Sequence, residues 1–475
     1  MMFKKMQFTL SAMALLGLAA CGGGGGGGGG DGGTANGVVA SGYPQAPASC
    51  EVAGQRAWLR DYMNDQYFWF NQQGAPNEAA SSMSEYLTSL TYKPTDRYSY
   101  AQSTTQFTQF FTEGRRTGYG YSLVFADAAQ TVLKLRLVEP LSPVAAAGLQ
   151  RGDTVVAIDG FSPAQITSGS LAAVSTVGVA RSFVVSKPNG ATLSFSVNSA
   201  DFALSPVLAS NVMTAPNNAK VGYLAYQEFI GSSNAALGNA INNFRAAGVS
   251  EVVLDLRYNG GGSTSVARNL ASMLGGPELD GRLFAQYRYN SKNTGNNFNQ
   301  LFTASTSVLP AAPLSGLSRV FVITSPNTAS ASELVFNSLK PFKGIVTVGG
   351  TSFGKPYAFQ PREACGTTYN AVNLEIVNAN GAAVSTSGVP ATCSVSDDLT
   401  RQLGDPAELR TAAALGYIST GVCPPVAIAS QDIVAKSLSD SAQTATKSIA
   451  KAPYENAALG ENGKPLPAPR GARVD

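Results

Sequence analysis

The sequence predicts a multidomain α/β protein, and three observations support this prediction. The chain has 475 residues, of which 44% are hydrophobic and 13% charged, so it is long enough for two or three globular domains. Its hydrophobic pattern is helical at first, then alternates as short strands do, and finally changes between strands and helices. The last pattern, from about residue 221 to 420, is typical of a core built on a largely parallel sheet.

Four segments follow the leader region. Residues 50–114 are expected to form a helical N-terminal domain, because aromatic and aliphatic residues recur at helical spacing. Residues 115–203 favour a β-rich domain, and residues 204–425 favour the α/β core. The final helix of that core is expected to start at Asp405-Pro406, a cap followed by proline. Residues 426–475, rich in Ala, Ser, Lys and Pro, are expected to be a low-complexity tail.

The beginning of the chain has the pattern of an export signal. Lys4 and Lys5 precede an apolar run at 8–20 that is too short to span a membrane. The residues Leu-Ala-Ala-Cys at 18–21 resemble the lipobox of bacterial lipoproteins, which implies cleavage before Cys21 and lipidation of its thiol. The alternative is an ordinary secretory signal followed by a chance cysteine.

The resemblance makes residues 1–20 a lipoprotein signal peptide. The glycine-rich residues 21–49 are then expected to be a flexible tether between the lipid and the folded domains. This organisation implies an exported protein of the cell envelope, on an outer membrane facing the periplasm or at the cell surface.

Four further cysteines favour disulfides in an oxidising compartment. Three pairings are available, and we favour Cys365 with Cys393 and Cys50 with Cys423. Independent free thiols are the alternative, and the absence of a CxxC spacing disfavours a zinc site.

Composition excludes several kinds of function. The chain contains no histidine, which removes Ser-His-Asp and Cys-His catalysis and the commonest transition-metal ligand. The net charge of +3 is spread without basic runs, so no nucleic-acid partner is expected. A hydroxyl nucleophile would need another base, and burial can lower the pKa of a lysine from about 10.4 toward roughly 7 to 8.

One serine and one lysine stand where such chemistry needs them. Ser330 follows an apolar strand and starts a helix, and Lys355 follows the next apolar strand, at 345–348. Both side chains should therefore reach the same edge of the sheet, where helical N–H groups favour developing negative charge. The alternative is a helix cap and a surface lysine without a function in common.

Two motifs around these residues resemble those of the carboxyl-terminal processing proteases, also called tail-specific proteases. They are Ala-Ser-Ala-Ser-Glu at 329–333 and Phe-Gly-Lys at 353–355. Lys355 lies 25 positions after Ser330 (355 minus 330), which is also the family's interval. The resemblance implies a ClpP/crotonase-like protease core in which Ser330 is the nucleophile and Lys355 the base.

A third motif, Asp-Leu-Arg-Tyr-Asn-Gly-Gly-Gly at 255–262, is similar to the family's glycine loop. It implies an oxyanion hole made by the backbone N–H of Gly261 or Gly262 together with that of Ala331. Such donors contribute about 3 to 4 kcal/mol each to transition-state stabilisation.

The β-rich segment resembles a PDZ domain. The resemblance rests on Gly118-Tyr119-Gly120-Tyr121 and on the stretch 142–160, which begins Ser-Pro and ends Asp-Gly. It implies that backbone N–H groups of the four-residue loop bind the terminal carboxylate of a peptide, which adds as a strand to the sheet edge. A plain tight turn is the alternative for the loop alone.

The sequence departs from the family pattern after the lysine. The family has a glutamine four residues beyond it, whereas this chain has Phe359 there and Gln360 next. On a strand this shift turns the side chain to the opposite face, so either a bulge restores Gln360 or another group, such as Glu333, orients Lys355. Pro356 replaces the family's glycine and favours an extended Lys355.

These resemblances imply a serine endopeptidase that cleaves exported proteins or their C-terminal tails and needs neither a metal nor an organic cofactor. Its expected partners are proteins with extended C-terminal segments. One alternative is a catalytically silent, peptide-binding lipoprotein scaffold, and another is a Ser/Lys amidase or esterase acting on small molecules. A second Ser-x-x-Lys, at 448–451, lies in the polar tail without a preceding sheet and is taken as coincidence.

Overall fold

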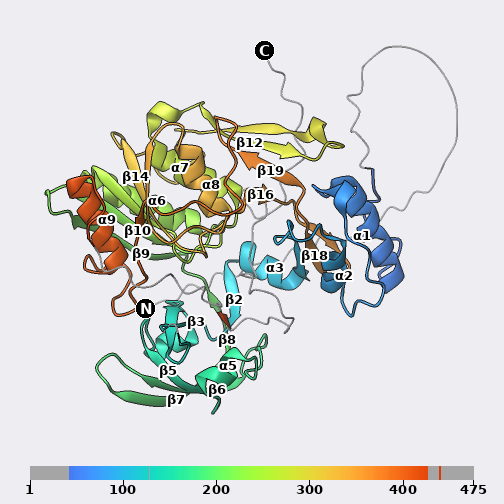
Figure 1. Cartoon of the computed structure of the whole chain (residues 1–475), viewed down its shortest axis with the longest axis horizontal. Helices are drawn as coiled ribbons and strands as arrows, with labels where there is room; N and C mark the ends of the chain where they lie inside the picture. Colours follow the sequence, from blue (N-terminus) through green and yellow to red (C-terminus); the bar gives the residue numbers. More distant parts are fainter. Residues whose placement is uncertain (1–41, 128, 426–437, 440–475) are drawn as a thin grey trace, which may run out of the picture. The chain divides into compact units, whose positions relative to one another are not determined.

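The computed structural model describes residues 42–127, 129–425 and 438–439 (Figure 1). The predicted signal peptide, the lipidation site Cys21, most of the tether and nearly all of the tail lie outside these residues. Within them the chain forms helices and several sheets, so the prediction of a mixed α/β multidomain fold is confirmed. No described helix has the length and apolar character needed to cross a membrane.

A six-stranded sheet forms the centre of the core, in the order β20-β15-β14-β11-β10-β9. Every neighbouring pair is parallel except β9 and β10, which are antiparallel. The strands are β9 (Val207–Thr214), β10 (Lys220–Tyr226), β11 (Glu251–Asp255), β14 (Arg319–Thr324), β15 (Gly344–Gly349) and β20 (Cys393–Ser394).

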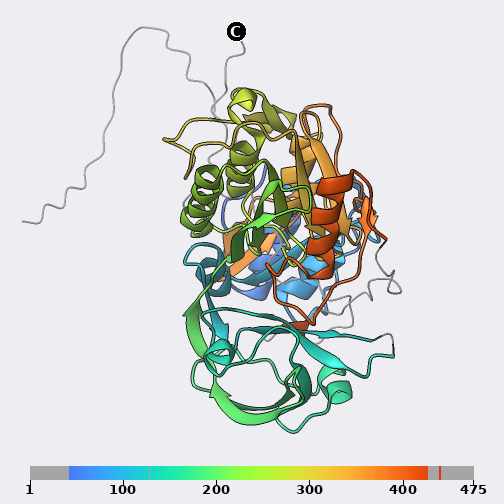
Figure 2. The same ribbon diagram turned by 90° about the vertical axis from the view of Figure 1, so that its left-hand side faces the viewer.

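Helices cover both faces of this sheet (Figures 1 and 2). On one face, α6 (Ser233–Ala247), α7 (Thr264–Gly275) and α8 (Ala331–Leu339) pack on residues such as Leu254. On the other, α9 (Leu409–Thr420) packs on neighbouring residues such as Val253. Because both faces are buried at the centre of the sheet, the inner strands β10, β11 and β14 are largely apolar runs, as is typical of parallel sheets.

The final helix begins later than the sequence predicted. Asp405 and Pro406 lie in the preceding turn, and α9 starts at Leu409 with Glu408 as its cap. The Glu408 side chain accepts a hydrogen bond from the backbone N–H of Thr411 over 2.9 Å and also binds the guanidinium of Arg257. This ion pair within the core fixes the start of the helix, and local sequence does not reveal it.

The N-terminal segment contains α1 (Val52–Gln66), the 3₁₀ turn η1 (Phe70–Gln72), α2 (Met83–Leu90) and α3 (Thr104–Phe111). Its strand β1 (Tyr100–Ser103) pairs with β18 (Thr367–Asn370), which on its other side pairs with β17 (Arg362–Ala364). A three-stranded sheet therefore joins this segment to the chain that follows Lys355.

Five strands of the β-rich segment form a second six-stranded sheet together with β21 from the C-terminal part of the chain, in the order β21-β3-β4-β5-β6-β7. A short two-stranded ladder of β2 with β8 leads into and out of it. Two short helices, α4 (Pro143–Ala146) and α5 (Pro163–Thr167), accompany the sheet. The strands are β2 (Arg115–Gly118), β3 (Tyr121–Phe125), β4 (Leu133–Val138), β5 (Thr154–Ile158), β6 (Ala180–Ser186), β7 (Thr192–Asn198), β8 (Ala200–Ala203) and β21 (Leu438–Ser439).

A smaller antiparallel sheet, β13-β12-β19-β16, completes the core. Strand β16 begins two residues after Lys355, so this sheet lies beside the predicted site. Its strands and the two remaining 3₁₀ turns are β12 (Leu283–Tyr289), β13 (Phe298–Leu301), β16 (Tyr357–Ala358), β19 (Leu374–Val377), η2 (Pro277–Leu279) and η3 (Thr294–Asn296).

The disulfide pairing predicted from the sequence is wrong. Cys50 bonds Cys365, and Cys393 bonds Cys423, each with Cα atoms 5.5 Å apart. The first bond links the start of α1 to the turn between β17 and β18, and the second links β20 to the end of α9. The pairing of β1 with β18 brings Cys50 and Cys365 together. The spacing of the cysteines along the chain does not indicate that contact.

Candidate active site

Ser330 lies at the junction between a strand and a helix. It follows β14 and is the residue immediately before α8, and its side chain lines a pocket. Its backbone angles are φ +56° and ψ −111°, a conformation that non-glycine residues rarely adopt. Strain of this kind costs on the order of 1 to 3 kcal/mol and is concentrated at functional sites.

Glu333 holds the backbone of Ser330 in this conformation. Its Oε2 accepts hydrogen bonds from the N–H of Ser330 over 2.9 Å and from the N–H of Lys355 over 2.8 Å. Its Oε1 accepts from the N–H of Gly354 over 2.8 Å and from the hydroxyl of Ser352 over 2.6 Å. Burial raises the pKa of Glu333, although these four donors stabilise its carboxylate and oppose that shift. The carboxylate therefore ties the serine segment to the lysine segment.

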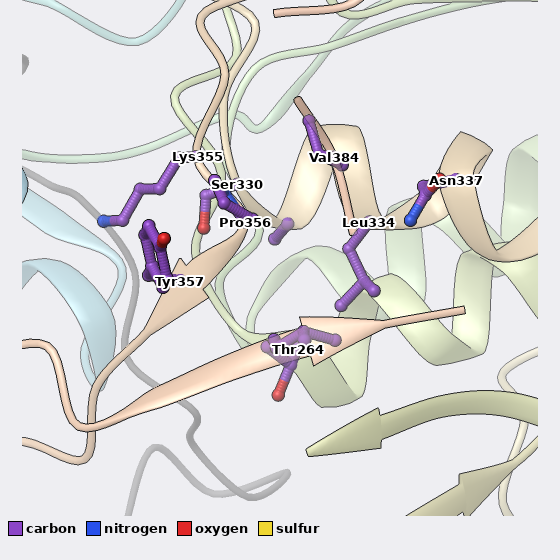
Figure 3. A pocket seen from close by; sticks show the side chains of 10 residues that line it. Thr264, Ser330, Leu334, Asn337, Lys355, Pro356, Tyr357 and Val384 are labelled. Atoms are coloured by element: carbon purple, nitrogen blue, oxygen red, sulfur yellow. The ribbon is translucent and has the colours of Figure 1, made fainter. Parts of the chain in front are cut away.

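Lys355 is 2% exposed and shares the pocket with Ser330 (Figure 3). Its Nζ lies 4.4 Å from the ring centroid of Phe359 and 5.9 Å from that of Tyr98. In the described part of the chain the Lys355 Nζ donates no hydrogen bond to the Ser330 hydroxyl, and hydrogen bonds of this kind are often long before a substrate binds. Away from the serine, the pocket wall is largely apolar and is formed by Leu334, Pro356, Ile376 and Val384.

The glycine loop is bound to the start of α8. The carbonyl of Asn259 accepts hydrogen bonds from the N–H of Ala329 over 3.2 Å and from the hydroxyl of Ser332 over 3.0 Å. Gly262 has a φ of +132°, and a Cβ there would lie 2.1 Å from the carbonyl oxygen of Phe229. Only glycine fits this position, where the loop packs against the backbone of Phe229.

The three predicted oxyanion donors differ in their surroundings. The N–H of Gly261 donates to Oδ1 of its own loop's Asn259 over 2.8 Å. The N–H of Gly262 has no hydrogen-bond partner among the described residues. Ala331 is the first residue of α8, where backbone N–H groups have no intrahelical acceptor, and it lines the pocket.

A buried ionic network lies at the start of the glycine loop. Arg257 binds Asp255, Asp397 and both carboxylate oxygens of Glu408, the latter over 2.6 and 2.9 Å. Burial alone disfavours ionised Glu408, but the Arg257 guanidinium lowers its pKa to about 2. Arg151, from the β-rich segment, binds the same Asp397 over 2.7 Å. The network therefore joins β11, α9 and the β-rich segment.

The side chain of Gln360 is bound to a tyrosine of β12. Its amide nitrogen donates to the hydroxyl of Tyr289 over 2.7 Å. Phe359 faces Lys355 instead, as the alternation of side chains on a strand requires.

The loop Gly118–Tyr121 is separate from this pocket and connects β2 to β3. Tyr119 and Tyr121 are buried in the core of the β-rich segment, where both contact Phe183. Gly120 has a φ of +84°, and a Cβ there would lie 2.0 Å from the Cβ of Ser142. The loop is a tight, glycine-dependent connection that lies at the start of β3.

The sequence did not predict that two further residues lie near Lys355. Tyr98 donates its hydroxyl proton to the carbonyl of Gly354 over 2.8 Å, and Arg97 donates to the carbonyl of Phe353 over 2.7 Å. Both lie more than 250 positions before the lysine. No local motif signals such a contact.

Comparisons with known proteins agree on one kind of enzyme, a serine-type peptidase. The profile of peptidase family S41 matches residues 220–394, and that of the peptidase S41 N-terminal domain matches residues 54–100. Together these contain Ser330, Lys355, the glycine loop and Tyr98.

Individual relatives are also peptidases. A carboxyl-terminal-processing protease of Picosynechococcus is 27% identical over 63% of this chain and 70% of its own length. A chloroplastic C-terminal processing peptidase of Tetradesmus obliquus is 30% identical over 51% of this chain and 52% of its own length. The crystal structure of an S41 protease from Bacteroides fragilis superimposes with a TM-score of 0.61 at 25% identity, over 77% of this chain and 97% of that one. Residues 220–394 thus carry a peptidase family S41 domain, and the chain is similar to carboxyl-terminal processing proteases.

Proposed function

We propose that this chain is a serine endopeptidase in which Ser330 is the nucleophile and Lys355 the general base. The observation that carries the proposal is the shared carboxylate oxygen of Glu333, which receives the backbone N–H groups of both residues. The strained serine and the buried lysine are thus held from one point, and both line the same pocket. A peptide-binding scaffold without catalysis has no need of a strained serine beside a buried lysine.

The reaction is acyl transfer. Neutral Lys355 accepts the hydroxyl proton of Ser330 as Oγ attacks the carbonyl carbon of the scissile peptide. The resulting ammonium gives its proton to the departing amine, which leaves an ester between Oγ and the substrate's acyl group. Water then attacks this ester with Lys355 again as base, and the free carboxylic acid and the serine are restored.

Negative charge on the substrate's carbonyl oxygen needs donors beside Ser330. Ala331 lies at the N-terminus of α8, where the helix dipole also favours an anion. The Gly262 N–H is the second donor, because the N–H of Gly261 is directed to Asn259. An oxyanion hole of two backbone groups requires no metal ion or organic cofactor.

Substrates are extended segments of exported proteins or their C-terminal tails, bound by a PDZ-like domain at residues 115–203. Support comes from edge strand β3, which already accepts an added antiparallel strand, Leu438 opposite Leu123 and Ser439 opposite Ser122. The added strand runs toward Tyr121 and thus toward the Gly118–Tyr121 loop. A peptide ending at that loop would present its carboxylate to the loop backbone.

The same proposal places the enzyme in the cell envelope, anchored through lipid on Cys21. Support comes from the lipobox-like residues at 18–21 and from two disulfides, which are typical of proteins in oxidising compartments. We expect the Cys21→Ser variant to be released from membranes and to retain cleavage activity.

Cleavage of an unfolded protein by the full chain, followed by mass spectrometry, tests the proposed chemistry. Ser330→Ala is expected to abolish cleavage while the far-UV circular dichroism spectrum and melting temperature stay near those of the unchanged protein. Full activity of a folded Ser330→Ala protein would refute the assignment. Absence of cleavage by the unchanged protein, across unfolded and C-terminally tagged substrates, would favour the scaffold.

A further inference from the structure

The segment that carries Lys355 is bound on one side by residues of the N-terminal segment. Tyr98 is 1% exposed, and its hydroxyl donates to the carbonyl of Gly354, the residue before the lysine, over 2.8 Å. Its ring lies 6.1 Å from that of Phe353 and 5.6 Å from that of Tyr357, measured between centroids. With Lys355 Nζ 5.9 Å away, the Tyr98 ring contacts side chains at three alternate positions along this segment.

Arg97 reinforces this contact from the surface. Its Nη2 donates to the carbonyl of Phe353 over 2.7 Å and to the carbonyl of Thr386 over 2.9 Å. Its guanidinium carbon also lies 4.2 Å from the ring centroid of Phe353. Arg97 therefore links the lysine segment to the loop that follows Val384, a residue of the pocket wall.

The backbone around Tyr98 is itself anchored. Asp96 is fully buried, and its Oδ1 accepts hydrogen bonds from the N–H groups of Tyr98 and Ser99, each over 2.9 Å. Its Oδ2 accepts from the hydroxyls of Tyr67 over 2.7 Å and Ser99 over 2.6 Å. The Tyr98 hydroxyl is therefore presented from a rigid turn, which a positioning group requires.

The lysine segment is consequently fixed from two sides. Glu333 binds the N–H groups of Gly354 and Lys355, and Tyr98 with Arg97 binds the carbonyls of Phe353 and Gly354. Gly354 permits this arrangement, because its φ is +85° and a Cβ there would lie 2.4 Å from the backbone nitrogen of Gly388. Lys355 follows this backbone, which is bound on both sides, so its side chain starts from a fixed position.

We propose that Tyr98, assisted by Arg97, is a positioning residue for Lys355 and sets the placement of its amine relative to Ser330. This inference rests on the proposed Ser330 and Lys355 chemistry. Tyr98 acts through the backbone of Gly354 and the flank of the lysine side chain and does not itself exchange a proton with substrate. It performs an orienting task from the N-terminal segment while Gln360 is engaged with Tyr289.

Tyr98→Phe removes the hydroxyl and keeps the ring, so it tests the contact with little change in volume. The matched control is Tyr86→Phe, whose buried hydroxyl bonds Arg60 and Glu78 within the N-terminal segment. Two rates are measured on the full chain: kcat and KM for an unfolded substrate, and the rate constant for labelling of Ser330 by a small fluorophosphonate. The second rate reports activation of the serine without substrate binding.

For Tyr98→Phe we expect kcat and the labelling rate to fall together, roughly 5- to 10-fold, which corresponds to the loss of one hydrogen bond of about 1 to 1.4 kcal/mol. KM should stay within about twofold, and the pH dependence of kcat should shift relative to that of Tyr86→Phe. Arg97→Met, an exposed substitution, should lower both rates by about 3-fold at an unchanged melting temperature.

Equal rates in Tyr98→Phe and Tyr86→Phe would overturn the inference, as would a rise in KM at constant kcat. A fall of Tyr98→Phe activity with no change in the Arg97→Met rates and an unshifted pH profile would assign Tyr98 a purely structural role and likewise overturn it. Failure of the proposed function is recognised separately. In that case the unchanged protein is not labelled at Ser330, or Lys355→Ala is labelled as fast as the unchanged protein.

Discussion

Ser330 and Lys355 donate their backbone N–H groups to one carboxylate oxygen, Oε2 of Glu333, over 2.9 and 2.8 Å. A single buried side chain thus fixes the distance between two segments that follow neighbouring strands of the central sheet. Glu333 therefore sets the relative position of nucleophile and base, although it exchanges no proton in the proposed reaction.

Glu333→Gln is expected to lower kcat by roughly 100-fold and the free energy of unfolding by about 1 to 3 kcal/mol. The amide has one acceptor oxygen in place of two, so one of its ends would present N–H groups to backbone donors. Steady-state kinetics and urea unfolding measure both effects. The control is Glu363→Gln, at an exposed position on β17, and equal activity of the two variants would contradict the assignment.

Gly262→Ala should impair both the glycine loop and catalysis, because its Cβ would lie 2.1 Å from the carbonyl oxygen of Phe229 and the residue has a φ of +132°. We expect kcat to fall by at least 10-fold through displacement of the Gly262 N–H. Gly295→Ala is the matched control, since a Cβ there meets no atom within 4 Å. Unchanged kcat in Gly262→Ala, measured on a folded sample, would remove this N–H from the oxyanion hole.

The Glu408 ion pair with Arg257 predicts a loss of stability in acid. Because the folded-state pKa of Glu408 is lowered from 4.5 to about 2, the ionised form stabilises the fold above pH 4.5. This contribution, about 3 kcal/mol at most, is lost as the pH falls from about 4.5 to about 2. Urea unfolding across this range should show a weaker pH dependence in Glu408→Gln than in the unchanged protein.

Glu278→Gln is the control for that measurement, because Glu278 pairs with Lys343 at the surface. Slight burial raises the pKa of Glu278, but the hydrogen bond from Lys343 lowers it overall. Because Glu278 is half exposed to solvent and the pair contributes little, Glu278→Gln should retain most of the pH dependence of the unchanged protein. If Glu408→Gln also retained it in full, the ion pair would not be the source of the acid sensitivity.

The pairing of Leu438 and Ser439 with β3 predicts competition for the peptide-binding edge. Removal of residues 426–475 from a Ser330→Ala background should tighten binding of peptides with a free C-terminal carboxylate several-fold, because a larger fraction of the edge is available. Fluorescence anisotropy with a labelled peptide measures this affinity. Removal of residues 442–475 is the control, since it keeps the paired strand, and equal affinities for both truncations would argue against competition.

Local sequence was sufficient for the features that depend on neighbouring residues. The apolar run before Ser330 and the helix after it correspond to β14 and α8, and the glycine loop follows β11 as expected. These elements were predictable because about a dozen consecutive residues determine the strand, its turn and the helix cap.

Contacts between distant segments were not predictable. The pairing of Cys50 with Cys365 depends on the β1 and β18 ladder, and the start of α9 depends on the Arg257 ion pair. Tyr98 and Arg97 reach the lysine segment only because the N-terminal segment packs against it. The shift from glutamine to Phe359 was visible in the sequence, but the residues facing Lys355 in its place required the fold.

The most direct test of the account is the site and rate of covalent labelling by a fluorophosphonate in the full chain. We predict one adduct, mapped to Ser330 by mass spectrometry, and a labelling rate at least 100-fold lower in a folded Lys355→Met variant. An adduct on another residue, or a Lys355→Met variant labelled at the rate of the unchanged protein, would contradict the claim that Lys355 activates Ser330.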